Sequence, residues 1–200
     1  MQKTQSMSKV QRLTLLGLMT ALVVVLQLLG SFIRFGEFSV SLVLVPIVLG
    51  AALCGPLAGG WLGLVFGAVV LFSGDAALFM GIDYVGTIVT VLVKGMAAGL
   101  LAGLVFSLLQ KKNRWWAILT AAIVCPVVNT GVFFAGCYLF FFDALSSGAA
   151  EKGQSVCVYI ILVMIGANFL FELLFNIVLS PVILRLTEIG TKIFQQRRGA

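Results

Sequence analysis

Residues 40–73 read VSLVLVPIVLGAALCGPLAGGWLGLVFGAVVLFS, without one charged side chain. A second uncharged run, WWAILTAAIVCPVVNTGVFFAGCYLFFF, covers residues 115–142. A helix needs about 20 predominantly apolar residues to cross a hydrocarbon core of about 30 Å. Runs of this length indicate that most of the chain lies in lipid.

The first run is too long to be a single span. As one helix it would extend about 50 Å, at a rise of 1.5 Å per residue. Its middle reads Cys54-Gly55-Pro56, and glycine followed by proline ends one helix and opens another. The run therefore predicts a hairpin of two short spans.

The whole chain predicts an all-α integral membrane protein with six transmembrane helices. Of its 200 residues, 61% are hydrophobic and only 10% are charged, unlike a soluble domain. The predicted spans cover about residues 13–32, 40–53, 57–72, 84–109, 115–142 and 155–186. They form a single membrane domain over residues 1–200. It has a cytoplasmic N-terminal segment (1–12), a six-helix bundle (about 13–187) and a basic cytoplasmic tail (188–200).

The lysines and arginines predict the orientation of these spans. Alternating sides put ten on one face: Lys3, Lys9, Arg12, Lys111, Lys112, Arg114, Arg185, Lys192, Arg197 and Arg198. The other face has only Arg34 and Lys152, and Lys94 falls inside a span. Cytoplasmic loops carry the excess of positive charge, so both termini are expected in the cytoplasm. Because the basic residues cluster at span ends, the net charge of +6 does not indicate nucleic-acid binding.

Small residues recur at helical spacing in three spans. Gly59, Gly63 and Gly67 repeat every four residues in the third span, and Gly95, Gly99 and Gly103 do so in the fourth. Small residues on one face let helix backbones approach closely in lipid, so packing within the chain is the favoured interpretation. A pair of small residues with the same spacing, Gly17 and Ala21, lies in the first span. It packs inside the chain or docks another subunit.

Five polar residues fall inside predicted spans: Lys94, Asn129, Asn168, Glu172 and Asn176. A charge at mid-bilayer costs about 2.5–3.5 kcal/mol on insertion scales, so it normally faces a partner or a cavity. Residues 168, 172 and 176 are spaced by four and share one helix face. Two interpretations stay open, a structural Lys94–Glu172 ion pair and a ligand-binding cavity.

The loops and cysteines add little chemistry. Arg34 is a candidate ligand contact at the external rim, whereas Glu37 and Asp75 are expected to be solvated. Cys54, Cys125, Cys137 and Cys157 do not have the spacing of a metal or redox motif. They are expected to be small apolar residues, with a Cys137–Cys157 bond left open.

The sequence lacks the motifs of several classes of enzyme. The chain has no Gly-x-x-x-x-Gly-Lys-Ser/Thr phosphate loop, so it does not hydrolyse ATP by that route. It contains no histidine, which excludes Ser–His or Cys–His catalysis and histidine-containing zinc sites. We expect no enzyme activity, no catalytic residue, no metal and no cofactor.

The sequence resembles the substrate-binding S components of energy-coupling factor (ECF) vitamin transporters over about residues 14–186. The resemblance rests on Gly17-Leu-Met-Thr-Ala21, on the run from Phe38 into Cys54-Gly-Pro-Leu-Ala-Gly-Gly, and on Val93-Lys-Gly-Met-Ala-Ala-Gly-Leu-Leu-Ala-Gly.

The resemblance implies a binding subunit in a prokaryotic plasma membrane. Such a subunit captures a vitamin from outside and associates with a transmembrane scaffold subunit and two cytoplasmic ATPases. An Ala-x-x-x-Ala motif on the first helix docks against the scaffold, so Gly17 and Ala21 would be the docking pair, with glycine replacing the first alanine. The family's pocket lies toward the outside, which matches Lys94, Asn129 and Asn168 and includes Glu172 less directly.

The sequence therefore predicts a membrane-embedded binding subunit that captures a vitamin-like solute for ATP-driven uptake. A lysine in the pocket favours a carboxylate such as pantothenate. One alternative is an autonomous transporter or channel driven by an ion gradient, with Lys94 and Glu172 as coupling groups. Another is a purely structural membrane subunit without a ligand.

Overall fold

A computed structural model describes residues 8–31, 34–35, 38–39 and 42–196. Its elements, in order, are α1 (Lys9–Gly30), β1 (Arg34–Phe35), β2 (Phe38–Ser39), α2 (Leu44–Cys54), α3 (Pro56–Ser73), α4 (Ala77–Met80), α5 (Tyr84–Leu109), α6 (Arg114–Phe140), α7 (Phe142–Glu151), α8 (Val156–Tyr159), the π-helix η1 (Ile160–Ile165) and α9 (Gly166–Gln196). The two-residue strands pair antiparallel. The all-α prediction is confirmed.

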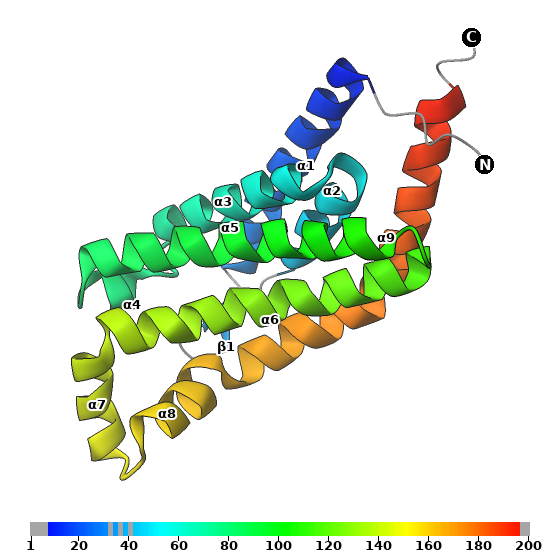
Figure 1. Ribbon diagram of the computed structural model, residues 1–200. Coiled ribbons are helices and arrows are strands. Elements are labelled where there is room, and N and C mark those ends of the chain that lie inside the picture. The colour runs from blue at the N-terminus through cyan, green and yellow to red at the C-terminus, as the bar shows by residue number, and fades with distance from the viewer. Residues whose placement is uncertain (1–7, 32–33, 36–37, 40–41, 197–200) are drawn as a thin grey trace.

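Within the described residues, five helices are long and apolar enough to cross a membrane: α1, α3, α5, α6 and the part of α9 from Asn168 to Lys192. Helix α5 packs between α3 and α6, and α9 lies against the far side of α6 (Figure 1). The first helix begins earlier than the expected residue 13, because the N-cap Ser8 and Gln11 in the first turn form a capping box. The last helix continues to Gln196, so most of the expected tail is helical.

Helix α2 does not have the length of a span. Its 11 residues extend only about 16 Å. It ends at Gly55, whose φ of 93° lies in the left-handed region that favours glycine, and Pro56 opens α3. The predicted break in residues 40–73 is therefore confirmed, while the first of the two helices is shorter than predicted.

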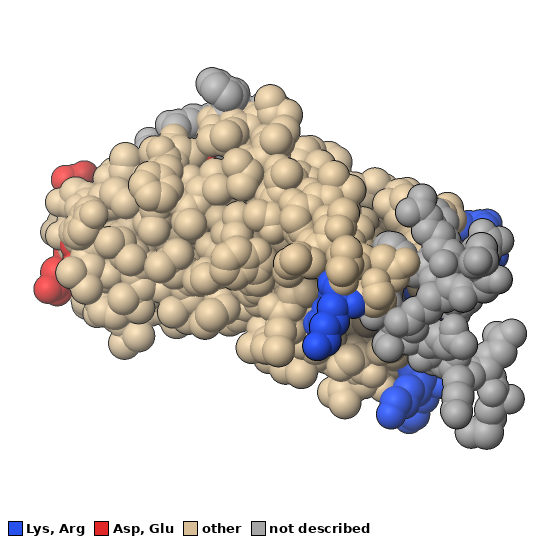
Figure 2. All heavy atoms as spheres, turned by 90° about the horizontal axis from the view of Figure 1, so that it is seen from above, with Lys and Arg blue, Asp and Glu red and all other residues tan. Residues whose placement is uncertain are grey.

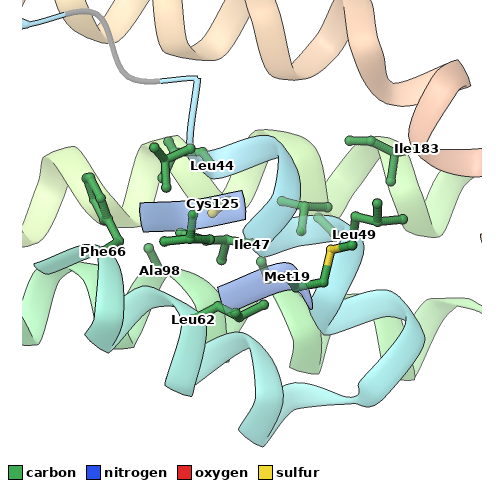
Figure 3. Packing of buried hydrophobic residues seen from close by; sticks show 14 of the residues in the cluster. Met19, Leu44, Ile47, Leu49, Leu62, Phe66, Ala98, Cys125 and Ile183 are labelled. Atoms are coloured by element: carbon green, nitrogen blue, oxygen red, sulfur yellow. The ribbon is translucent and has the colours of Figure 1, made fainter. Parts of the chain in front are cut away.

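Helix α2 instead forms the centre of the bundle. Eight of its 11 residues are buried, with Leu44 and Ile47 fully buried. It contacts α1, α3, α5, α6 and α9. Figure 3 shows its leucines and isoleucine among Met19, Leu62, Phe66, Ala98, Cys125 and Ile183 from these helices. A short helix that is apolar on every side is stable only when protein surrounds it.

The glycine repeats hold α3 against α5. A methyl group added at Gly67 would lie 2.7 Å from the carbonyl oxygen of Val91. A methyl group added at Gly63 would overlap the carbonyl group of Gly95, and one added at Gly95 would overlap the carbonyl group of Gly63. The predicted packing role of both repeats is confirmed, because no larger residue fits between these backbones.

The last long segment is not one regular helix. It passes from α8 through the π-turns of η1 into α9, and Gly166 at the junction has φ −21° and ψ −89°. Within α9, Pro181 lacks the N–H of a regular helix, and the helix changes direction along its length in Figure 1. π-Turns inside α-helices are frequent at functional sites, and η1 ends three residues before Asn168.

Most acidic and most basic side chains of the described residues lie at opposite ends of the molecule, although Lys152 follows α7 at the acidic end and Glu188 lies on α9 near the basic end. On the face drawn in Figure 2, acidic residues lie at one end and basic residues at the other. The α5–α6 turn carries Lys111 and Lys112, while Asp75 and Asp83 flank α4 at the opposite ends of α3 and α5. The long axis of the bundle therefore runs from an acidic end to a basic end.

Candidate functional site

Glu172 of α9 is the centre of a polar cluster inside the bundle. Its side chain is only 2% exposed. One carboxylate oxygen accepts a hydrogen bond from Asn129 Nδ2 of α6 at 3.4 Å, and the other accepts from Asn168 Nδ2 at 3.3 Å. The structure therefore joins three of the predicted site residues, from two helices, through one carboxylate.

Asn176 completes this cluster from one turn further along α9. Its Nδ2 donates to the backbone carbonyl of Glu172 at 2.8 Å, and its side chain is 1% exposed. The hydrogen bonds of Asn168 and Asn176 to Glu172 confirm the expected shared face of residues 168, 172 and 176. All three asparagine NH₂ groups thus bind acceptors of one residue.

This arrangement leaves three buried acceptors unused. The Oδ1 atoms of Asn129, Asn168 and Asn176 have no hydrogen-bond partner among the described residues, and neither has Thr90 Oγ1. A buried polar atom without a partner costs about 1–3 kcal/mol, so such atoms normally contact water or a ligand. The cluster is chemically suited to a molecule that offers several N–H or O–H donors.

Lys94 of α5 lies among aromatic side chains. Its Nζ is 5.1 Å from the ring centroid of Phe133 and 5.7 Å from that of Phe66, at cation–π distances. Glu172 and Asp75 both lie within electrostatic range of this ammonium group. Among the described residues, however, Lys94 forms no ion pair and no hydrogen bond. The direct Lys94–Glu172 ion pair, one of the two open interpretations, is not formed in the structure. The carboxylate of Glu172 instead accepts hydrogen bonds from the amides of Asn129 and Asn168.

A second polar group, which the sequence analysis missed, joins α1 to the end of α3. Gln27 is 2% exposed and its Nε2 donates to Asp75 Oδ2 at 2.8 Å. The hydroxyl of Ser73 donates to the same oxygen at 2.8 Å. The expectation that Asp75 is merely solvated is wrong, because it is half-buried and accepts these two hydrogen bonds. A lone glutamine in an otherwise apolar span was the signal that could have found this group.

Other predicted residues lie apart from the cluster. The backbone of Arg34 belongs to β1, and its side chain lies outside the described part of the structure, as does Glu37. Gly17 and Ala21 are exposed on α1, and a methyl group added at Gly17 would meet nothing within 4 Å. The interpretation in which this pair packs inside the chain is therefore wrong.

The cysteines supply no chemistry to the site. All four are free thiols, with Cys54, Cys125 and Cys137 buried and Cys157 exposed. The bond between Cys137 and Cys157 that the sequence left open is not formed. Cys125 and Cys137 instead pack as small apolar side chains in two hydrophobic clusters.

A family model described as "ECF transporter, substrate-specific component" matches residues 11–184. The chain belongs to this family. The resemblance seen in the sequence is confirmed, and the S component is a multi-pass protein of a prokaryotic cell membrane. The family consists of substrate-binding components of transporters for vitamin uptake, not of enzymes.

The fold of this S component is similar to that of ThiT from Listeria monocytogenes. The TM-score is 0.60 and the sequence identity is 23%, over 92% of this chain and 98% of the other. At this identity the similarity concerns the fold alone. A comparison with curated proteins gives no match.

Proposed function

We propose that this S component captures a small vitamin-like solute on the outer side of the membrane for ATP-driven uptake. The cluster around Glu172 is its binding site, with Lys94, Asn129 and Asn168 as contacts and Arg34 at the rim. A scaffold subunit and two cytoplasmic ATPases complete the transporter. The chain itself is a binding protein and performs no catalysis.

The single observation that supports this function best is the set of unused acceptors. Three amide carbonyl groups, all buried and all turned away from Glu172, are too costly to keep without a partner inside lipid. A purely structural cluster would have paired them with donors of the chain. A solute with amide, amine or hydroxyl donors would satisfy them.

Lys94 supports a substrate that also carries an anionic group. Its ammonium has three donors and, within the described residues, no acceptor. The rings of Phe66 and Phe133 hold the ammonium group in place but do not neutralise its charge. A carboxylate next to hydroxyl and amide groups, as in pantothenate, fits these requirements.

The proposed orientation puts both termini in the cytoplasm. It counts α2, although shorter than the bilayer, as the second of six membrane helices and α3 as the third. The separation of basic and acidic ends supports it through the positive-inside rule. Trp115 and Trp116 are exposed at the start of α6 beside the basic end, where aromatic residues anchor helices at the membrane surface. The Glu172 cluster then lies within the membrane, reached from the acidic, external side.

Gly17 and Ala21 are the proposed docking pair for the scaffold subunit. They are exposed on α1, and the small side chains leave room for a partner helix at backbone distance. Leu18 and Leu22 beside them are exposed as well, which is typical of a helix face that meets lipid or another transmembrane helix.

The binding site is tested by thermal unfolding of the purified protein with a panel of vitamins. A ligand at 100 times its Kd adds about 2.7 kcal/mol of stability, or roughly 5–10 °C in a chain of this size. In Glu172→Gln the side chain loses its charge and one of its two acceptor oxygens, so Asn129 and Asn168 can no longer both donate to it. Their amides lose the fixed orientation, and we expect at least about tenfold weaker binding. Glu188→Gln makes the same chemical change on the same helix and is the matched control. Equal stabilisation of all three proteins would place the ligand elsewhere.

The partner dependence is tested by uptake of the identified ligand in cells with and without the ATPases. Accumulation should require all subunits. Ion-dependent, ATP-independent flux in liposomes that contain only this chain would instead support the gradient-driven transporter.

A further inference from the structure

A groove between α1 and α3 lies away from the Glu172 cluster, near the basic end of the bundle. It has a volume of about 300 Å³. Its lining residues are Lys9, Arg12, Leu13, Leu16, Leu57, Ala58 and Trp61. Two cations therefore lie in the first turn of α1, and every other lining side chain is apolar or aromatic.

The apolar walls of this groove are open to the membrane. Leu13 is 72% exposed and Leu57 is 78% exposed. Trp61 is half exposed, and its indole N–H donates to Thr20 Oγ1 at 3.2 Å, which fixes the ring against α1. The groove thus has a rigid aromatic wall, and its sides suit a hydrocarbon chain.

Lys9 and Arg12, at the charged end of the groove, have N–H donors that are free to bind an anion. The Arg12 guanidinium donates to the backbone carbonyl of Cys54 at the end of α2. A guanidinium carries five N–H donors, so this contact leaves others for a phosphate. Within the described residues neither Lys9 nor Arg12 has a carboxylate partner, and the sequence contains no acidic residue before Glu37.

We propose that this groove binds one anionic phospholipid of the inner leaflet. The phosphate lies between Lys9 and Arg12, and an acyl chain follows Leu13, Leu16 and Leu57 to Trp61. Charge complementarity selects the headgroup, because basic residues near a membrane attract anionic lipids. The apolar lining of the groove favours a lipid with an acyl chain over a free phosphate. Since Arg12 also holds the end of α2, the lipid would stabilise the junction between α1 and the central helix.

The test is native mass spectrometry of the full chain in mild detergent, titrated with three probes. These are phosphatidylglycerol, phosphatidylcholine with the same acyl chains, and glycerophosphoglycerol, which is the anionic headgroup without chains. We expect one phosphatidylglycerol bound per chain, weaker phosphatidylcholine binding, and no retained glycerophosphoglycerol.

Variants of Lys9 separate this groove from general attraction to a basic surface. Lys9 is exposed, so Lys9→Gln should fold normally and bind phosphatidylglycerol about fivefold more weakly, the effect of one basic side chain near a lipid surface. Lys9→Arg should restore the affinity. Lys111→Gln removes an equally exposed charge from the same end of the bundle and should leave binding unchanged.

Three results would overturn the proposal. Equal binding of the two phospholipids would mean that Lys9 and Arg12 do not recognise the headgroup. An equal loss in Lys111→Gln would mean that only the overall charge matters. Lipid-free dimers lost in Lys9→Gln would mean that a second copy of the chain occupies the groove.

Discussion

At the scale of single residues, Glu172 determines the orientation of the asparagine amides in the site. Because its two carboxylate oxygens and its backbone carbonyl all accept hydrogen bonds, the NH₂ groups of Asn129, Asn168 and Asn176 turn toward it. Their carbonyl oxygens must then point the other way. One acidic residue thus converts three ambiguous amides into three acceptors of fixed orientation, which is the property a selective site requires.

Lys94 gives the sharpest residue-scale prediction. Lys94→Met keeps the length of the side chain and removes a charge that has no ion-pair partner among the described residues. A charge at this depth costs about 2.5–3.5 kcal/mol, so we expect the variant to unfold at the same or a higher temperature. We also expect it to bind a carboxylate-bearing vitamin at least about tenfold more weakly, about 1.4 kcal/mol. Thermal unfolding with and without ligand measures both effects.

The control for Lys94→Met is Lys94→Arg, which keeps the charge and should retain part of the affinity. Unchanged affinity in Lys94→Met would show that the ammonium does not contact the ligand. A large loss of stability without ligand would show that the lysine is structural.

At the scale of elements, α3 and α5 depend on contact between their backbones. Gly63→Val would drive a side chain into the carbonyl group of Gly95, which is backbone that cannot rotate away. Overpacking costs about 1–3 kcal/mol even where side chains can adjust, so we expect at least that loss in the free energy of unfolding. The control is Gly131→Val on α6, where an added methyl group meets nothing within 4 Å. Equal unfolding temperatures of the two variants would contradict the backbone contact.

At the scale of the whole molecule, Cys157 reports the orientation. It is the exposed member of the four cysteines, and it follows the α7–α8 turn at the acidic end of the bundle. If that end faces outward, a membrane-impermeant maleimide should label intact cells at Cys157. Cys157→Ser should abolish the labelling, because the other thiols are buried. Labelling that requires permeabilised cells would reverse the proposed orientation.

Assembly of the transporter gives the second prediction at this scale. Gly17→Leu adds a large side chain to an exposed face of α1, so the S component should keep its unfolding temperature and its ligand affinity. Co-purification with the scaffold subunit should fall at least about tenfold, because the close approach of the helices is blocked. Gly17→Ala remains small and should assemble normally. Normal assembly of Gly17→Leu would place the docking face elsewhere.

The sequence by itself determined that the chain lies in lipid, where its helices break, and which polar residues are candidates for the binding site. Long uncharged runs indicate a lipid environment, and Gly55 followed by Pro56 ends one helix and opens the next, because both effects are local. The glycine spacing on α3 and α5 correctly predicted a close contact, since small residues are what such a contact requires. The four-residue spacing of Asn168, Glu172 and Asn176 likewise predicted a shared face.

Only the tertiary structure decided which of these groups meet. It placed α2 at the centre of the bundle and brought Gln27 into hydrogen-bond contact with Asp75. It also paired the Glu172 carboxylate with Asn129 and Asn168 and not with Lys94. In lipid, acyl chains are as apolar as a neighbouring helix, so hydrophobicity does not choose the neighbours. Shape complementarity and the satisfaction of polar groups make that choice, and both depend on the positions of residues far apart in the chain.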